Sequence, residues 1–212
     1  MTIAHAANNW GLYTNLAWSP TFYREQYSLN VHDSATLSIL PSVAGAIGGV
    51  VAGTVADRLL KNGADRTAVR KLFQGLALFG AATCLSILTY IISSASVPLR
   101  TDIAASDYYS INSYNTPFMA QTLLTCAVGL QSFNAAGYGA SAQEKAGDKW
   151  AGLLYSVTSL PGVIMGSVAV YATGQILDLG LGWNYVFGLN VIVDIIGAAS
   201  FIALYDSRKE FD

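Results

Sequence analysis

Six long apolar stretches constrain the fold of this 212-residue chain more than any other feature. A helix needs about 20 predominantly apolar residues to cross a bilayer. A transmembrane β-strand would instead show about ten residues of alternating polarity, and these stretches do not alternate. The sequence therefore predicts an all-α membrane protein with six transmembrane helices, at approximately residues 3–22, 37–56, 72–92, 118–139, 151–177 and 185–205.

The composition offers few charges to cover a water-exposed surface. Charged residues make up 11% of the chain, hydrophobic residues 53%, and the mean hydropathy is +0.42, whereas about a quarter of a typical soluble domain is charged. We therefore expect membrane lipid around the protein. The net charge of −2 and the lack of a basic patch outside the loops argue against a nucleic-acid partner. Cys84 and Cys126 lie inside apolar stretches and are interpreted as packing residues without a disulfide or metal role.

The basic residues predict the orientation of the helices. If the N-terminus and every second loop are cytoplasmic, nine basic residues lie on that side and two, Arg24 and Arg100, lie on the other. Cytoplasmic loops carry such an excess, so both termini are expected inside and the loop from Val97 to Pro117 outside. The nine are Arg58, Lys61, Arg66, Arg70, Lys71, Lys145, Lys149, Arg208 and Lys209.

Small residues within the stretches indicate close helix packing. Gly45, Gly49 and Gly53 recur every four residues, a spacing that lets two helix backbones approach closely in lipid. Pro161 and Gly162 predict a kink or a flexible point in the fifth stretch. Met1 is not followed by the basic segment of a secretory signal, and the first apolar stretch begins almost at once. We expect from this start an incomplete gene product or the second half of a longer chain.

Several segments resemble a known transporter family. Gly53-Thr-Val-Ala-Asp57-Arg58, followed by Val69-Arg70-Lys71, is similar to a cytoplasmic loop of the major facilitator superfamily. More narrowly, the chain resembles the C-terminal half of the anion:cation symporter family, which includes sodium/phosphate cotransporters, sialin, vesicular glutamate transporters and plant plastid anion transporters. The other segments that carry this resemblance are His5 to Trp10, Trp18-Ser-Pro20-Thr-Phe-Tyr, Lys149-Trp-Ala-Gly-Leu-Leu-Tyr155 and Trp183-Asn-Tyr-Val-Phe187.

The resemblance implies a fold and a function. The chain would supply helices seven to twelve of a twelve-helix transporter, with the N-terminal six-helix half of the same transporter as its partner. It would move a small organic or inorganic anion, phosphate-like or a carboxylate, by alternating access. A sodium or proton gradient would drive it, with no cofactor beyond that coupling ion. The membrane stays open between plasma membrane, vesicle and plastid envelope.

Two departures from the family pattern bear on the cargo. Family members carry Asn-His-x-Asp after the tenth helix, whereas this chain reads Ser141-Ala-Gln-Glu144. The vesicular glutamate members have an arginine before the tryptophan of the seventh helix, where this chain has Asn8-Asn9-Trp10. Glutamate is therefore a less favoured substrate, the coupling ion stays open, and Glu144 and His5 are the candidate coupling residues.

Polar residues within the apolar stretches are the candidates for a substrate cavity, because such residues are costly in lipid. Gln131, Asn134, Tyr138 and Ser141 are spaced three, four and three apart, which predicts one stripe on one helix. They either line the cavity or hydrogen-bond to neighbouring helices. The first helix presents His5, Asn9 and Tyr13 at four-residue intervals, with Asn8 and Trp10 alongside, and His5 either titrates in coupling or lies hydrated near the interface.

Two further groups of charged residues need an interpretation. Asp57, Arg58, Arg70 and Lys71 are predicted to form a gating loop, in which the acid pairs with basic residues in one conformation; alternatively the basic residues only set topology. Asp194 lies in the middle of the sixth stretch and is interpreted as structural. The alternatives are a non-transporting, truncated membrane scaffold or sensor, or a major facilitator transporter of a different substrate class. An enzyme is disfavoured, because His5 and His32 are the only histidines and no metal-ligand array is present in the sequence.

Overall fold

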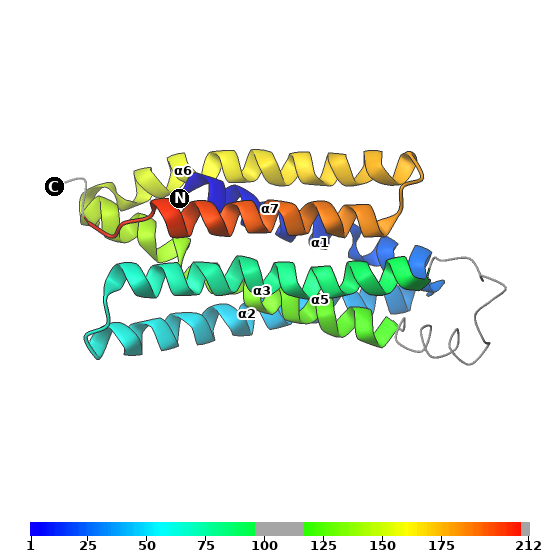
Figure 1. The fold of residues 1–212 in the computed structure, drawn as a ribbon, viewed down its shortest axis with the longest axis horizontal. Helices are drawn as coiled ribbons and strands as arrows, with labels where there is room; N and C mark the ends of the chain where they lie inside the picture. Colours follow the sequence, from blue (N-terminus) through cyan, green and yellow to red (C-terminus); the bar gives the residue numbers. More distant parts are fainter. Residues whose placement is uncertain (96–116, 209–212) are drawn as a thin grey trace.

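A computed structural model describes residues 1–95 and 117–208. All regular secondary structure in these residues is helical, which confirms the all-α prediction, and the helices run along one long axis (Figure 1). The predicted loop at 97–116, and Arg100 and Lys209 of the charge count, lie outside the described residues. In chain order the elements are α1 (Thr2–Tyr27), α2 (Val31–Lys61), α3 (Arg66–Ala95), α5 (Pro117–Gln131), the 3-10 helix η1 (Ser132–Ala135), α6 (Tyr138–Asp178) and α7 (Trp183–Leu204).

Four of the described helical segments are long and apolar enough to cross a membrane. They are Val31–Lys61, Arg66–Ser94, Trp150–Asp178 and Trp183–Leu204. α1 is long but interrupted by amides and hydroxyls along its length. α5 has 15 residues, and at 1.5 Å per residue it is about 22 Å long, shorter than the roughly 30 Å hydrocarbon core. Six membrane spans therefore stay a prediction, and four are supported by length and composition.

The chain breaks where the sequence predicts a single helix over residues 118–139. α5 ends at Gln131, and Gly137, with φ −88° and ψ −103°, separates η1 from α6. The side-chain oxygen of Gln74 in α3 accepts a hydrogen bond from the Tyr138 N–H at 2.8 Å. A β-carbon at Gly137 would lie 2.6 Å from that oxygen, so only glycine allows this approach. The continuous helix over 118–139 was therefore a wrong prediction. Residues 140–150, predicted as a loop, are helical within α6, but the chain reverses direction in this part of α6. The Tyr138 and Thr158 hydroxyls lie 3.0 Å apart, whereas 20 residues of straight helix span about 30 Å.

The short connection between α2 and α3, residues 62–65, lies inside the predicted basic loop, whose basic residues belong to the ends of the two helices. Gly63 adopts a left-handed conformation with φ +86°, which turns the chain back after α2. Asp65 then caps α3, because its carboxylate accepts a hydrogen bond from the Ala68 N–H at 2.7 Å. Asp57 and Arg58 lie on the last turns of α2 and are both exposed.

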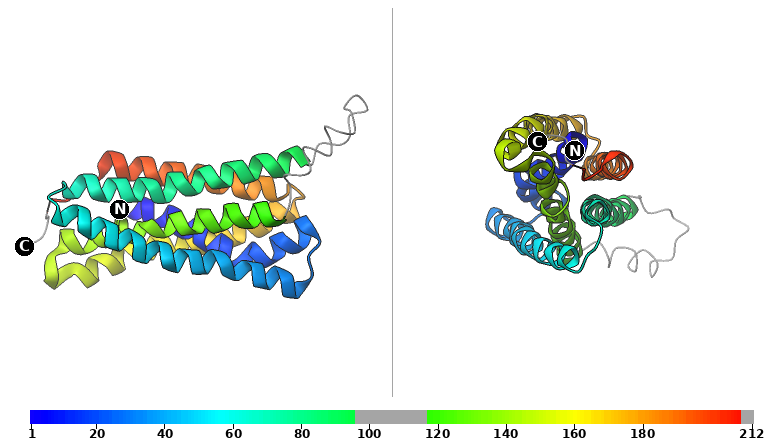
Figure 2. Two further views of the ribbon diagram at one scale, coloured as in Figure 1. Left: turned by 90° about the horizontal axis from the view of Figure 1, so that it is seen from below. Right: turned by 90° about the vertical axis from the view of Figure 1, so that its left-hand side faces the viewer.

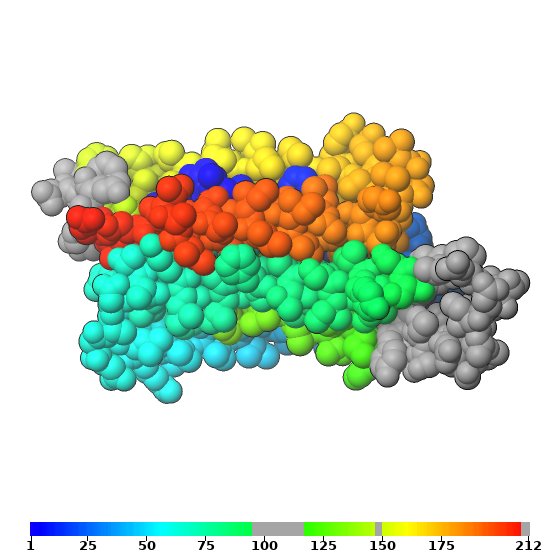
Figure 3. Space-filling view, in the orientation of Figure 1, coloured from blue at the N-terminus to red at the C-terminus, as the bar shows by residue number. Residues whose placement is uncertain are grey.

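The helices pack in pairs around a shared interior. α1 lies along α6, α3 along α7, and α2 along α5. The end-on view in Figure 2 places α3 and α7 on one side of the bundle and α6, α1 and α2 on the other. Figure 3 shows α3 and α7 forming much of one face. An aromatic cluster closes the interior near the start of α7, where Phe22 meets Phe187 and Trp183 at ring-centroid distances of 5.1 and 5.2 Å.

Two helices expose most of their apolar surface. Only 22% of the apolar window of α2 and 17% of that of α6 are buried, against 44% for α3 and 39% for α7. α2 and α6 therefore depend on lipid or on further protein to cover their apolar side chains.

Glycines set the closest approaches of α2 to the α5–η1 segment, and two of the three predicted ones, Gly45 and Gly49, face that segment. A β-carbon at Gly48 would overlap the carbonyl of Gly129 in α5, whereas one at Gly53 would meet no atom within 4 Å. Gly53 therefore packs on no other helix within the described residues, and its predicted packing role stays a prediction. In α6 the helix continues through Pro161, and Gly162 lies directly under the side chains of His5 and Asn9.

Candidate functional site: an amide-lined groove

A groove of about 290 Å³ lies between α1, α2 and the α5–η1 segment. Its volume is close to the lower end of typical ligand pockets, at roughly 300 Å³. Leucine, valine and glycine form part of its wall. Its polar lining consists of Asn8, Asn15, Ser42, Gln131, Ser132 and Asn134.

Three of these amides form a connected network across α1 and α5. Asn134 donates to the side-chain oxygen of Asn8 at 3.0 Å and to the backbone oxygen of Gln131 at 2.9 Å. Gln131 in turn donates to the backbone oxygen of Asn8 at 3.3 Å. The network fixes the side-chain orientation of Asn8, because its side-chain and backbone oxygens both accept hydrogen bonds.

The electrostatics of the groove are neutral. Its described lining contains amides, hydroxyls and apolar groups, without a lysine, arginine or histidine. Amide and hydroxyl hydrogens can donate to phosphate or carboxylate oxygens. An anion in this groove would therefore be oriented by this chain and would need its compensating positive charge from elsewhere.

The other predicted residues of α1 face α6 instead of the groove. The His5 ring packs edge-on against Tyr138 at 4.4 Å between centroids. Asn9 and Tyr13 lie over Gly162 and Gly166 of α6. The structure thus separates Asn8 from His5, Asn9 and Tyr13, although the sequence grouped them. Trp10 is buried.

The predicted stripe of four polar residues is divided by the helix break. Gln131 and Asn134 line the groove, whereas Tyr138 and Ser141 belong to α6. The Tyr138 hydroxyl lies 3.0 Å from that of Thr158, within α6 itself. Ser141 is fully buried and donates to the backbone oxygen of Gly137 at 2.6 Å. A single stripe on one helix was therefore a wrong prediction.

An ion pair joins two residues that the sequence placed in different roles. Arg70 donates through Nε to Oε2 of Glu144 at 3.0 Å and through Nη2 to Oε1 at 2.5 Å. Its Nη1 donates to the backbone oxygen of Ala136 at 2.8 Å. Because Arg70 is 5% exposed, this bidentate pair ties α3 to α6 across the helix break. One feature of the sequence could have predicted this pair. Glu144 is an acid at the edge of an apolar stretch, and such an acid needs a basic partner when it is buried.

The remaining residues of the predicted gating loop are not engaged in this way. Asp57 and Arg58 are exposed and Lys71 is half-buried. Within residues 1–95 and 117–208, none of the three forms an ion pair. In the same residues, no group of three or more His, Cys, Asp or Glu side chains could hold a metal ion.

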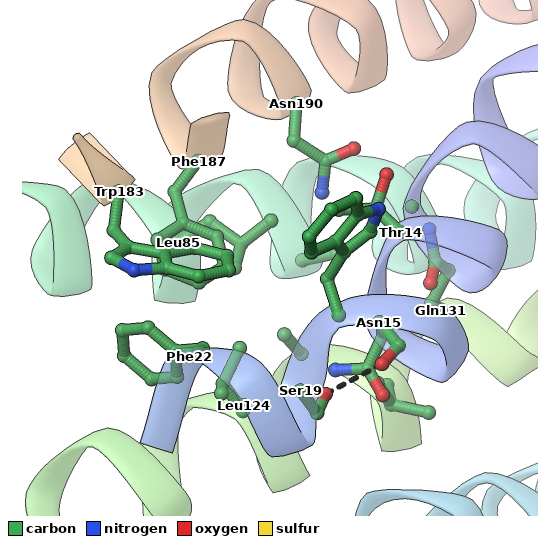
Figure 4. Close-up of a pocket in the computed structure, with 15 residues that line it drawn as sticks. Thr14, Asn15, Ser19, Phe22, Leu85, Leu124, Gln131, Trp183, Phe187 and Asn190 are labelled. Carbon is green, nitrogen blue, oxygen red and sulfur yellow. Dashed lines mark hydrogen bonds between the residues drawn. The ribbon is translucent and has the colours of Figure 1, made fainter. Parts of the chain in front are cut away.

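A second, much smaller cavity lies inside the bundle between α1, α3, α5 and α7. Its volume is about 20 Å³, which suits roughly one water molecule. Figure 4 shows Phe22, Trp183 and Phe187 on one side of it and Thr14, Gln131 and Asn190 on the other. This cavity is too small for an anionic metabolite.

Comparison with known proteins gives the relatives of this chain. No family model matches the chain. It is 30% identical over 197 residues to the chloroplastic ascorbate transporter of Arabidopsis thaliana, which covers 93% of this chain and 32% of that protein. It is 29% identical over 208 residues to the chloroplastic sodium-dependent phosphate transport protein 1 of the same plant, covering 98% and 36%. The predicted resemblance to anion transporters is confirmed.

A third relative extends the comparison to rice. The chloroplastic probable anion transporter 5 of Oryza sativa subsp. japonica is 30% identical over 211 residues, covering 99% of this chain and 40% of that protein. The chain spans about a third of the length of the curated relatives it matches. These relatives are transporters and not enzymes, which agrees with the non-enzymatic prediction.

Proposed function

We propose that this chain forms the C-terminal half of an anion transporter of the major facilitator type. The amide-lined groove carries the proposal. Transporters of this kind bind their substrate near the middle of the membrane, at the interface between their repeats. The groove has a size and a hydrogen-bonding surface suited to a phosphate or a small carboxylate. Alternating access would require a second six-helix half, which would close the groove and supply the positive charge that its lining lacks.

The coupling ion is either sodium or a proton. The relative named as a sodium-dependent phosphate transport protein supports sodium. His5 and Glu144 are the coupling candidates from the sequence, and Glu144 is bound to Arg70 in this structure. Asp57, Arg58, Arg70 and Lys71 stay the proposed gating residues, since they gather where α2 meets α3.

The proposed location follows from the relatives and the charge pattern. The relatives are chloroplastic, which supports a plastid membrane over a vesicle or the plasma membrane. Both termini would face the cytoplasmic side, or its topological equivalent, because nine of the eleven basic residues gather there.

Transport by the full gene product in proteoliposomes tests the proposal. We expect uptake of labelled phosphate, ascorbate or another small carboxylate when a sodium or pH gradient is imposed. Gln131→Leu removes a donor from the groove and should reduce that uptake. Gln175→Leu makes the same chemical change at an exposed position near the end of α6 and should leave uptake unchanged.

Two results would contradict the proposal. One is the absence of gradient-driven flux of every tested anion by folded protein, which would favour the scaffold or sensor. The other is equal loss of uptake in both glutamine variants, which would show that the groove has no special role.

A further inference from the structure

Asp194 is buried in the middle of α7 without a hydrogen-bond partner. Its exposed fraction is 0%, and neither carboxylate oxygen has a bonding partner among the described residues. It lies 11 residues after Trp183, about 16 Å along the helix from that end. Water at the ends of the bundle therefore cannot reach it directly.

Among the described residues, the surroundings of Asp194 provide no compensating charge. Gly197, one turn further along, packs on Ala7 of α1 and Leu78 of α3, which identifies the segments that face Asp194. Residues 4–11 of α1 contain one ionisable side chain, His5, whose ring lies against Tyr138 of α6. Residues 75–85 of α3 contain Cys84 alone, which packs against the aromatic cluster.

Two further helices adjoin α7. α5 borders the cavity beside α7, and Cys126 is the one ionisable side chain in its sequence. α6 leads into α7. The ionisable residue of α6 nearest that connection is Asp178, an exposed side chain five residues before Trp183. It lies at the end of the helix, a long way from Asp194. An ionised carboxylate without a partner costs at least several kcal/mol to bury. Asp194 therefore carries a proton in this conformation.

Two more unpartnered polar groups connect Asp194 to the water-sized cavity. Asn190 lies four residues before Asp194, on the same face of α7, and its side-chain oxygen has no partner in the described part of the chain. Thr14 of α1 also has an unpartnered hydroxyl. Asn190 and Thr14 both line the cavity, as Figure 4 shows. One water there would bond to both groups and approach the carboxyl along α7.

We propose that Asp194 is a proton-binding site, loaded from a water held between Thr14 and Asn190, and that its proton is the coupling ion of transport. The inference rests on the proposed transport function. The loading step transfers a proton from a hydronium ion in the cavity to a carboxylate oxygen, leaving water and the neutral acid. Release on the opposite side reverses the step. A hard metal cation would need about six oxygen ligands, and the two carboxylate oxygens with the Asn190 oxygen supply too few.

The test compares Asp194→Asn with Asp178→Asn in the full gene product. Asparagine keeps the shape and neutrality of a protonated aspartate, so the first variant should fold. We expect it to lose the accumulation of anion driven by a pH gradient and to keep the exchange of labelled for unlabelled anion across the membrane. The second variant changes an exposed acid and should keep both activities.

Infrared spectroscopy gives a readout independent of transport. The wild-type protein should show a stretching band of a protonated carboxyl group that Asp194→Asn removes and Asp178→Asn retains. A wild type without this band would overturn the proposal, even if the anion is transported. So would proton-driven accumulation by Asp194→Asn, or a sodium-driven accumulation that requires Asp194. A protein that shows the band but moves no anion would contradict the proposed function and the coupling role, and would leave the protonation of Asp194 established.

Discussion

Alanine substitutions at two glycines of α2 should have opposite effects on stability. A β-carbon at Gly48 would lie 2.5 Å from the hydroxyl of Ser132 and 3.2 Å from the carbonyl carbon of Gly129, with the carbonyl oxygen closer still. Favourable contacts between heavy atoms need about 3.5–4.0 Å. The hydroxyl can rotate away, but the backbone carbonyl cannot. α2 and α5 would therefore have to separate by roughly an ångström.

The size of the effect follows from this geometry. Overpacking a well-packed interface costs about 1–3 kcal/mol, and alanine is more favourable than glycine inside a helix by about 0.5–1 kcal/mol. Gly48→Ala should therefore be destabilising by about 1–2 kcal/mol. The added β-carbon of Gly53→Ala meets no atom within 4 Å. This variant should therefore be more stable than the wild type by the helix preference of alanine alone, about 0.5–1 kcal/mol.

The measurement is thermal unfolding of the two variants in the same detergent, followed by circular dichroism of the helices. Both variants replace glycine by alanine in the same helix, so the helix preference of alanine contributes equally to both. The difference between their unfolding free energies therefore reports the cost of overpacking at Gly48. A gap of about 2 kcal/mol corresponds to about 4–8 °C for a chain of this size. Equal melting temperatures, or a lower one for Gly53→Ala, would refute the packing register derived from the structure.

Three further substitutions test individual contacts by the same unfolding assay. Glu144→Gln should lower stability by about 1–3 kcal/mol, because Arg70 stays buried with weaker acceptors, and an additional Arg70→Met should cost less than in the wild-type background. Tyr138→Phe should cost about 1 kcal/mol through loss of the Thr158 contact, whereas Tyr155→Phe, at a 43% exposed side chain, should be neutral. Trp18→Phe should cost about 1 kcal/mol, because the indole N–H donates to the Val170 backbone oxygen at 3.1 Å and links α1 to α6; an unchanged stability would show that water replaces this bond.

The sequence predicts helices well and their interruptions poorly. Hydropathy locates the apolar segments because each has to be covered by lipid or by other helices, whatever its partners. The break after Gln131 depends on Gln74 and on Arg70, which bind the freed backbone at Tyr138 and Ala136. These contacts come from residues more than 60 positions away, so no local pattern could indicate them. The register of the packing glycines depends in the same way on where α5 meets α2.

The candidate site was predictable only in part. Asn8, Gln131 and Asn134 stand out because amides are costly in an apolar helix, and the structure places them together in one groove. Asn15 and Ser42 were missed, since each becomes part of the groove only through the packing of α2 on α1. The burial of Asp194 without a partner could not be predicted either, because helical spacing does not show which neighbours supply a hydrogen bond.

The groove also discriminates between the transporter and the truncated scaffold. Its lining residues come from α1, α2, α5 and η1, and the end-on view shows α1 and α2 on the other side of the bundle from α3 and α7 (Figure 2). If this side faced lipid, the half-buried Asn134 would contact hydrocarbon, at a cost of a few kcal/mol for each polar group left unsatisfied. α3 and α7 present an apolar face that lipid can cover without such a cost. The polar groove therefore favours a second protein half over this side, and a scaffold made of this chain alone would leave the groove's amides in lipid.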